Sequence, residues 1–115
     1  MNFVEGRVEG GAGAAAALSS TPLALPSKNV LDGSEVIFGV RPQHLKVDPA
    51  GESHTVDLVE SLGGVSYVYL IAASGERLTV ELGEDDPMPS GAKVGLTFDP
   101  AKMMLFDRKT EMRIR

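Results

Sequence analysis

The sequence contains no cysteine and no tryptophan, and only two tyrosines and four phenylalanines among its 115 residues. The lack of cysteine excludes disulfides, zinc–thiolate sites and thiol nucleophiles. Positive charge is also scarce, because eleven Lys and Arg stand against sixteen Asp and Glu, for a net charge of −5. Nucleic-acid binding draws most of its affinity from cations that neutralise phosphates, so we expect no nucleic-acid partner and no adsorption to anionic lipid.

A long hydrophobic run is missing as well. Residues 10–27 are uncharged, but they are mainly Ala, Gly, Ser and Pro, and no basic segment precedes them. The side chains of this segment are too small and too weakly apolar for a membrane-spanning helix. We therefore expect neither a signal peptide nor direct membrane insertion. A chain of this length with 43% apolar residues can form one ordinary core. We therefore expect a single domain over residues 1–115, with a variable segment at 9–27 and a charged tail at 107–115.

The apolar pattern predicts seven or eight short strands separated by Gly, Pro and Asp turns. The expected strands are residues 1–8, 36–40, 54–62, 65–72, 77–82, 92–98 and 103–106, with a proline-bracketed extended segment at 21–26 and a loose hairpin or loop at 10–18. No window shows sustained helical periodicity. The fold class is therefore all-β, and a small barrel of the oligonucleotide/oligosaccharide-binding (OB) type fits best.

Alternation within these strands predicts which side chains face inward. Val56 and Leu58, with Glu60 as a further candidate, fall on one face of their strand. In the later strands the inward residues are predicted to be Leu78, Val80, Leu82, Val94, Leu96 and Phe98.

Residues 38–45 and residues 96–103 share a sequence pattern. Each segment is an apolar strand followed by a polar residue, a proline, two residues that can turn and an apolar anchor. Proline suits the first position of a helical turn, and Asp99 can cap the second turn. We expect a structural pseudo-repeat with one or two short helical turns.

Catalytic motifs are not found. Residues 10–13 have the glycines of a phosphate loop but neither its lysine nor a following helix. Ser90 and Lys93 have a Ser-x-x-Lys spacing, but they lie in a turn before a strand, so we interpret the spacing as chance.

His44 and His54 are expected to be surface or turn residues, since nothing in the sequence brings three or four metal ligands together. The acidic run 84–86 lacks the alternating spacing of a calcium loop. Tyr67 and Tyr69 share a strand face and are predicted to be core or interface residues rather than a base-stacking platform.

Four strings, in order, carry a family resemblance. Residues 1–8 look like the segment that leaves the nucleotide-binding domain in sugar-import ABC ATPases. Residues 38–45 resemble their Gly-(Ile/Val)-Arg-Pro-Glu-His signature, 56–63 their Val-Glu-x-Leu-Gly strand, and 96–107 their closing run. The chain thus resembles the C-terminal regulatory, transport-associated (TOBE-type, also molybdate-pterin-like) barrel of the maltose- and glycerol-phosphate-type importer ATPases.

This resemblance implies a domain that does no chemistry itself. The chain lacks the phosphate loop and Leu-Ser-Gly-Gly-Gln signature of the parent enzymes, so ATP and Mg²⁺ are implied only for an ATPase domain outside it. The implied partners are a second copy of the domain, its own ATPase domain, the membrane subunits indirectly and, in some members, a regulatory protein. The implied location is cytoplasmic, peripheral to the inner membrane. The chain is then either an excised fragment or a stand-alone relative.

The resemblance also supplies candidate regulatory, interface or signature-turn residues. They are Arg41, Pro42, Gln43, His44, Glu60, Gly63, Asp99, Pro100 and Phe106. Two departures limit the transfer: Gln43 stands where glutamate is usual, and an Ala/Gly segment at 10–18 replaces a more polar hairpin. No catalytic, cofactor-binding or metal-binding residue is predicted.

A different class of function remains open. Single-domain molybdate-binding barrels share the implied fold, although their Ser-Ala-Arg-Asn-type motif is not found here, and a site of backbone N–H groups needs no positive charge. A hydrolase has no motif in its favour. The transported substrate cannot be identified from the sequence.

Overall fold

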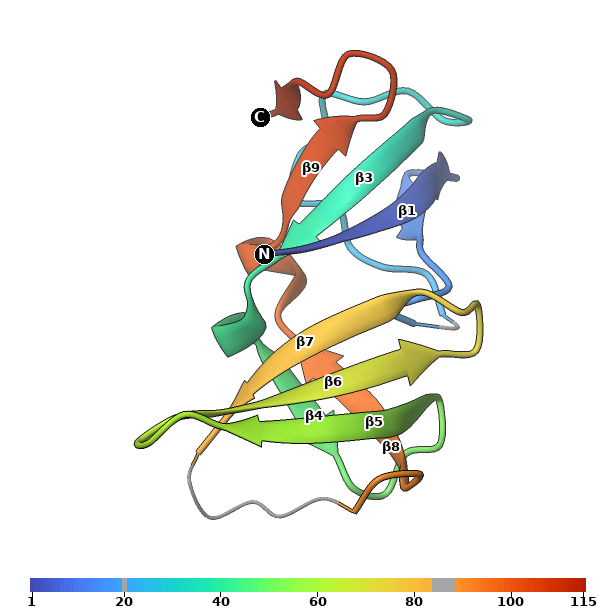
Figure 1. Ribbon diagram of the computed structural model, residues 1–115. Coiled ribbons are helices and arrows are strands. Elements are labelled where there is room, and N and C mark those ends of the chain that lie inside the picture. Colours follow the sequence, from blue (N-terminus) through green and yellow to red (C-terminus); the bar gives the residue numbers. More distant parts are fainter. Residues whose placement is uncertain (20, 84–88) are drawn as a thin grey trace.

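The computed structural model describes residues 1–19, 21–83 and 89–115, and it confirms the all-β class. Ten strands of the described residues form two five-stranded antiparallel sheets, set one above the other in an elongated molecule of 42 × 25 × 21 Å (Figure 1). The strands are β1 (Asn2–Glu9), β2 (Ala12–Ala14), β3 (Glu35–Val40), β4 (Leu45–Asp48), β5 (His54–Ser61), β6 (Ser66–Ala72), β7 (Arg77–Leu82), β8 (Lys93–Phe98), β9 (Met104–Asp107) and β10 (Arg113–Ile114). The expectation of seven or eight strands missed the short β4 and β10.

The first sheet is built from both ends of the described chain, in the order β10-β9-β3-β1-β2. Its centre is Phe38, whose buried ring lies over Gly6 and Gly13. A Cβ at Gly6 would overlap this ring, and a Cβ at Gly13 would come within 2.7 Å of it. The two glycines therefore make the space that the aromatic ring fills.

The second sheet is built from the middle of the chain, in the order β4-β8-β5-β6-β7. Leu78, Val80 and Leu82 of β7 are buried, as their alternation predicted. Leu96 and Phe98 of β8 are only half-buried, although both were expected to face inward.

The prediction that Val56 and Leu58 lie on the same face of their strand was wrong. A β-bulge shifts the register of β5 against β6 between these two residues, so Val56 is buried while Leu58 is 45% exposed. One extra residue in a strand moves the side chains that follow it to the opposite face of the sheet. The strand then ends at a turn in which Gly63 and Gly64 have φ angles of 64° and 93°, conformations that favour glycine.

The Ala/Gly-rich segment forms the expected loose hairpin. Gly10 and Gly11 turn the chain from β1 into β2 with positive φ angles, and Gly13 forms an isolated bridge with Leu23 in the proline-bracketed segment. The alanines and leucine that follow β2 supply buried core residues, among them Ala15, Ala17 and Leu18.

His54 corrects the expectation of surface histidines. It is 2% exposed, and its ring lies 2.7 Å from the carbonyl oxygen of Ala17 through Nε2 and 2.7 Å from the Ser53 hydroxyl through Nδ1. A carbonyl only accepts, so Nε2 carries a proton and donates it to Ala17. The ring joins β5 to the segment after β2.

The two sheets are also joined by a side-chain amide at their boundary. Asn2 of β1 donates to the carbonyl of Thr79 at 2.8 Å and accepts from its N–H at 2.7 Å. Thr79 lies in β7, the edge strand of the second sheet, so the Asn2 amide pairs backbone groups at that edge as a neighbouring strand would. Nearby, the Glu76 carboxylate accepts from the N–H of Glu5 at 3.3 Å.

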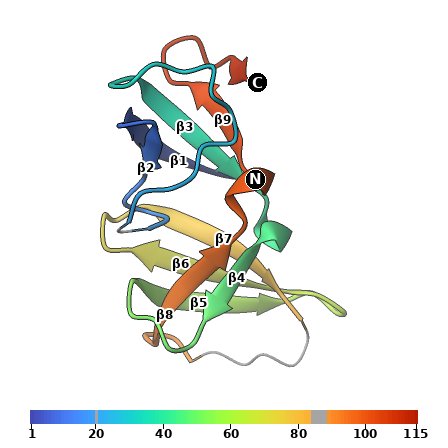
Figure 2. The same ribbon diagram turned by 180° about the vertical axis from the view of Figure 1, so that it is seen from behind.

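Two crossovers carry the chain between the sheets, and both contain one short 3₁₀ turn (Figures 1 and 2). The first turn, η1 (Pro42–His44), leads from β3 to β4, and the second, η2 (Pro100–Lys102), leads from β8 to β9. Each turn starts at a proline, and the Asp99 carboxylate accepts from the N–H of Ala101 at 3.0 Å as predicted. The apolar anchors Leu45 and Met103 are both buried. The pseudo-repeat is therefore confirmed as a structural feature.

No helix in the described residues is long and apolar enough to span a membrane. The acidic run Glu84–Asp86, for which calcium binding was rejected, lies outside the described residues.

Candidate functional site

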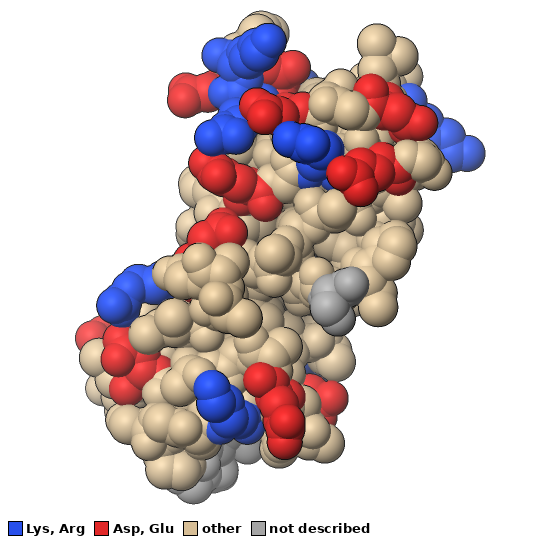
Figure 3. Space-filling view, turned by 90° about the vertical axis from the view of Figure 1, so that its right-hand side faces the viewer, with Lys and Arg blue, Asp and Glu red and all other residues tan. Residues whose placement is uncertain are grey.

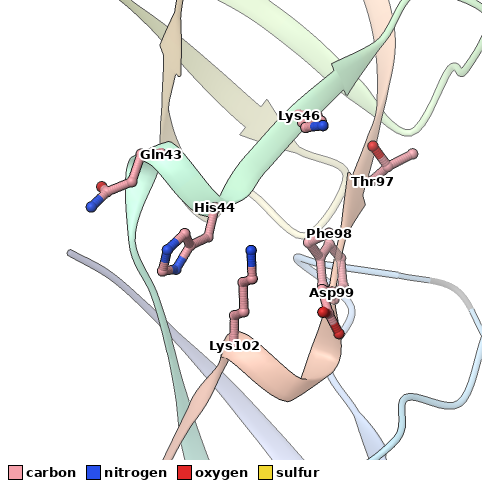
Figure 4. A pocket seen from close by; sticks show the side chains of 7 residues that line it. All are labelled: Gln43, His44, Lys46, Thr97, Phe98, Asp99 and Lys102. Atoms are coloured by element: carbon pink, nitrogen blue, oxygen red, sulfur yellow. The ribbon is translucent and has the colours of Figure 1, made fainter.

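The two crossovers meet at the waist of the molecule and leave an open cleft of about 330 Å³ between them. We call this the waist cleft. It is lined by Gln43, His44, Lys46, Thr97, Phe98, Asp99 and Lys102 (Figure 4). The walls are held together because β4 pairs with β8, with Leu45 opposite Phe98 and Lys46 opposite Thr97. Figure 4 shows the Lys102 side chain extending from η2 towards His44 and Phe98.

The pseudo-repeat explains why these residues converge. His44 and Lys102 occupy the same position in the two repeats, the last residue of each 3₁₀ turn. Because the two turns lie side by side in antiparallel crossovers, equivalent residues reach the same cleft from opposite sides. Of the lining residues, Gln43, His44 and Asp99 were candidates from the sequence, whereas Lys46, Thr97, Phe98 and Lys102 were not. The repeat was the signal that would have paired Lys102 with His44.

The lining of this cleft has more basic than acidic side chains. Two ammonium groups, Lys46 and Lys102, line it together with one carboxylate, Asp99, whose Oδ1 already accepts from the Ala101 N–H. In the part of the chain that the structure describes, neither lysine belongs to an ion pair. The cleft thus differs from the protein as a whole, which carries a net charge of −5.

His44 has an unusual environment in the cleft. Its Nδ1 is fully buried and has no hydrogen-bond partner among the described atoms. The remaining ring nitrogen, Nε2, is therefore the one through which His44 can make a polar contact.

The other predicted residues do not all gather here. Arg41, Pro42 and Pro100 belong to the same crossovers, as the residue before η1 and the first residues of the two turns. Glu60 is exposed near the end of β5, and Gly63 lies in the turn after it. Neither of these two lines the waist cleft.

Phe106 belongs to a second surface, on the outer side of the first sheet. There Phe3, Ile37 and Phe106 line a shallow hollow of about 330 Å³ with Glu111. Phe3 is 60% exposed, and its ring stands edge-on to that of Phe106, with the centroids 5.9 Å apart. Met1 adds a further half-exposed apolar side chain. We call Met1, Phe3, Ile37 and Phe106 the apolar patch.

Charges of both signs surround this sheet. Arg108 pairs with Glu5 at 3.0 Å and with Glu35 at 3.5 Å, and Arg7 approaches Glu35 at 3.7 Å. On the face shown in Figure 3, acidic and basic side chains alternate at the end of the molecule formed by the first sheet. No extended surface of one sign is seen on that face.

Asp107, at the end of β9, has a pKa below its ordinary value. The chief cause is the backbone N–H of Thr110, which donates to its carboxylate at 2.9 Å, followed by the N–H of Lys109 at 2.8 Å. Both bonds favour the charged form and hold the turn that leads to β10.

Metal ligands do not converge in the described residues. No group of three or more His, Asp or Glu side chains among them is placed to hold a metal ion.

Taken together, the two sheets and their paired crossovers define a β module of the OB type. The TOBE domain model matches residues 38–106, and the model of the MalK OB fold domain matches residues 1–45. The chain therefore belongs to the TOBE domain family, and its first 45 residues match the OB fold domain of MalK.

Several relatives extend this placement. The chain is 34% identical to the sulfoquinovosyl glycerol transport ATP-binding protein SmoE of Agrobacterium fabrum, over 99% of this chain and 33% of that protein. It is also 34% identical to the sn-glycerol-3-phosphate import ATP-binding protein UgpC 2 of the same organism, over 84% of the chain and 27% of the relative. The alpha-glucoside transport ATP-binding protein AglK of Rhizobium meliloti gives 34% identity over 76% and 25%. The chain thus spans between a quarter and a third of the length of these relatives.

The fold also resembles a solved structure outside this group. The cytoplasmic molybdate-binding protein ModG, crystallised with molybdate, superposes with a TM-score of 0.69 over 90% of this chain and 94% of that chain. Sequence identity is 17%, so this likeness concerns the fold alone.

Proposed function

We propose that this chain is the regulatory and dimerisation domain of the ATP-binding subunit of an ABC importer for sugars or related polyols. The names of the relatives, which include alpha-glucoside, sn-glycerol-3-phosphate and sulfoquinovosyl glycerol transport, support this substrate range. The catalytic steps then belong to an ATPase domain of the kind found in the full-length relatives, with ATP and Mg²⁺ bound there. Membrane subunits are contacted indirectly, and a regulatory protein is a further partner in this proposal.

The apolar patch is the observation that carries the proposal. A phenylalanine that is 60% exposed beside a second ring is unusual on a small protein surface, and contiguous exposed apolar patches mark interaction sites. The occupant that we propose is the same patch of a second copy. A two-fold pair brings identical surfaces together, and the mixed rim of Glu5, Arg7, Glu35 and Arg108 lets each charge meet an opposite one.

Such pairing gives the domain a mechanical role. Two domains that stay paired keep their ATPase domains at a high effective concentration, so that closure after hydrolysis is an intramolecular event. A partner that binds better to the open arrangement inhibits transport by its differential affinity for that state. Because the patch is small, we expect the isolated domains to pair weakly.

Sedimentation velocity over a wide range of concentrations tests this proposal. We expect a concentration-dependent dimer that Phe3→Ser abolishes. Leu31→Ser is the matched control, because Leu31 is 82% exposed in a loop away from the patch and its loss should leave pairing unchanged. A chain that stays strictly monomeric at high concentration, or variants that behave alike, would show that this patch is not the tether.

The alternative is a stand-alone oxyanion-binding barrel of the molybdate type. Its support is the shared fold with ModG. Calorimetric titration with molybdate and tungstate distinguishes the two: saturable, tight binding by a monomeric chain favours the alternative, whereas its absence with dimerisation favours the regulatory domain.

A further inference from the structure

The outer face of the second sheet carries two tyrosines that the proposed pairing does not use. Tyr67 and Tyr69 alternate along β6 with the buried Val68 and Leu70, so both rings lie on the side of the sheet that faces away from the core. Both tyrosines are half-buried, and β6 lies between β5 and β7 (Figure 1). Tyrosine is enriched at protein interfaces, because its ring is apolar and its hydroxyl is polar.

Tyr67 lies between two carboxylates. In the register of the sheet, Glu60 of β5 is opposite Tyr67 on one side, and Glu81 of β7 is opposite it on the other. Residues that are opposite one another share a face of the sheet, with Cβ atoms about 4.5–5.5 Å apart. In the part of the chain that the structure describes, neither glutamate belongs to an ion pair. This row therefore presents one aromatic ring flanked by two negative charges.

A positively charged side chain satisfies all three groups of this row. The face of a tyrosine ring attracts a guanidinium or ammonium group. The carboxylates on either side accept charge-assisted hydrogen bonds from the same group. The net charge of −5 also favours the approach of a basic partner.

The neighbouring row adds an apolar contact. Tyr69 lies two residues further along β6, about 7 Å from Tyr67. It is opposite Leu58, which the bulge in β5 leaves 45% exposed. An extended segment also repeats the direction of its side chains every second residue, over the same distance. A basic residue seated on Tyr67 thus places the residue two positions away over Tyr69 and Leu58.

We propose that this face docks an extended segment of a partner protein that carries arginine or lysine two positions from an apolar residue. The basic side chain lies on Tyr67 between the two glutamates, and the apolar side chain contacts Tyr69. We call this surface the tyrosine face, and its residues are Leu58, Glu60, Tyr67, Tyr69 and Glu81.

A second copy of the chain fits this face less well than a separate partner does. The cations at the other end of the same sheet face are already engaged. Arg77 pairs with Asp57 at 3.0 Å, and Lys93 donates to the Thr55 hydroxyl at 2.9 Å. A second copy would have to break these contacts before it could offer a cation to the two glutamates.

The test is an NMR titration of the ¹⁵N-labelled chain with an acetylated, amidated peptide of sequence Thr-Arg-Thr-Leu-Thr. We expect saturable shifts of backbone amides in β5, β6 and β7 around the two tyrosines, which weaken as salt is added. A peptide with glutamate in place of arginine should not bind. A peptide in which arginine and leucine are adjacent should bind more weakly, because the two side chains then point to opposite sides of an extended chain.

Variants of the chain locate the site. Glu60→Gln and Glu81→Gln should each weaken binding about two- to fivefold, the effect of one exposed ion pair. Glu9→Gln is the matched control, because it removes the same charge from an exposed position on the first sheet and should leave the affinity unchanged. Tyr67→Leu should weaken binding about two- to fivefold, whereas Tyr67→Phe keeps the ring and should bind like the parent.

The outcomes are distinct. The proposal would be overturned by an absence of saturable shifts, by shifts that map to another surface, by equal effects of Glu9→Gln and Glu60→Gln, or by equally tight binding of the glutamate peptide. If Glu60→Gln changed the sedimentation of the free chain, the occupant would be a second copy and the proposal would be wrong. Pairing through the apolar patch involves the first sheet alone, so Phe3→Ser should abolish it without weakening peptide binding, and the two proposals can fail separately.

Discussion

Replacing Asn2 by alanine removes the side-chain amide that joins the first strand of one sheet to the edge strand of the other. In the native protein this amide satisfies both the N–H and the carbonyl of Thr79, at 2.7 and 2.8 Å. Asn2 is buried, so water does not readily replace it. The variant therefore leaves two backbone groups without partners at the boundary between the sheets.

The expected loss of stability follows from those two groups. Leaving one buried polar group unsatisfied costs about 1–3 kcal/mol, and Thr79 is only partly shielded, so we expect about 2–4 kcal/mol for the pair. Small domains lose about 1–3 kcal/mol of stability per molar urea. With a slope of about 2 kcal/mol per molar, the middle of that range, the midpoint of urea unfolding should fall by about 1–2 M, with the slope unchanged.

Urea unfolding followed by circular dichroism measures this shift, and hydrogen exchange at the Thr79 amide reports the local effect. Asn29→Ala is the matched control, because Asn29 is exposed and its side-chain amide donates to the carbonyl of Arg115. Its backbone N–H, which donates to the Ser27 hydroxyl, is kept in the variant. Its midpoint should change little. If Asn2→Ala is no more destabilising than Asn29→Ala, the side-chain amide does not hold the sheets together and the reasoning fails.

Two further predictions concern the first sheet. Gly6→Ala should lower the free energy of unfolding by about 1–3 kcal/mol, since the new Cβ would overlap the buried Phe38 ring; a thermal melt equal to that of the parent would contradict this. The Asp107 carboxylate should titrate below its ordinary pKa of 3.8, because the N–H groups of Thr110 and Lys109 favour its charged form. A depressed folded-state pKa means that these bonds stabilise the turn above the ordinary pKa and are lost as the pH falls through the lower, folded-state value; an NMR titration with a midpoint at or above 3.8 would refute it.

Local chemistry explains which parts of the fold were predictable. Proline at the first position of both 3₁₀ turns and the cap at Asp99 are encoded within a few residues, so the pseudo-repeat could be recognised from the sequence. The alternation of Leu78 and Val80 likewise reflects a regular strand with one buried face. These features depend on neighbours in the chain, which is why pattern and structure agree.

The features that were missed depend on neighbours in space. The bulge that exposes Leu58 arises from how β5 pairs with β6. The alternation of apolar and polar residues in β5 does not predict this bulge. His54 stands two residues before Val56, so alternation alone would have placed it inward; its polar character suggested the surface, and the Ala17 carbonyl that satisfies it comes from a distant segment. The exposure of Phe3 depends on which segments pack against the outer face of the first sheet. The pattern of apolar residues in a strand does not specify this packing.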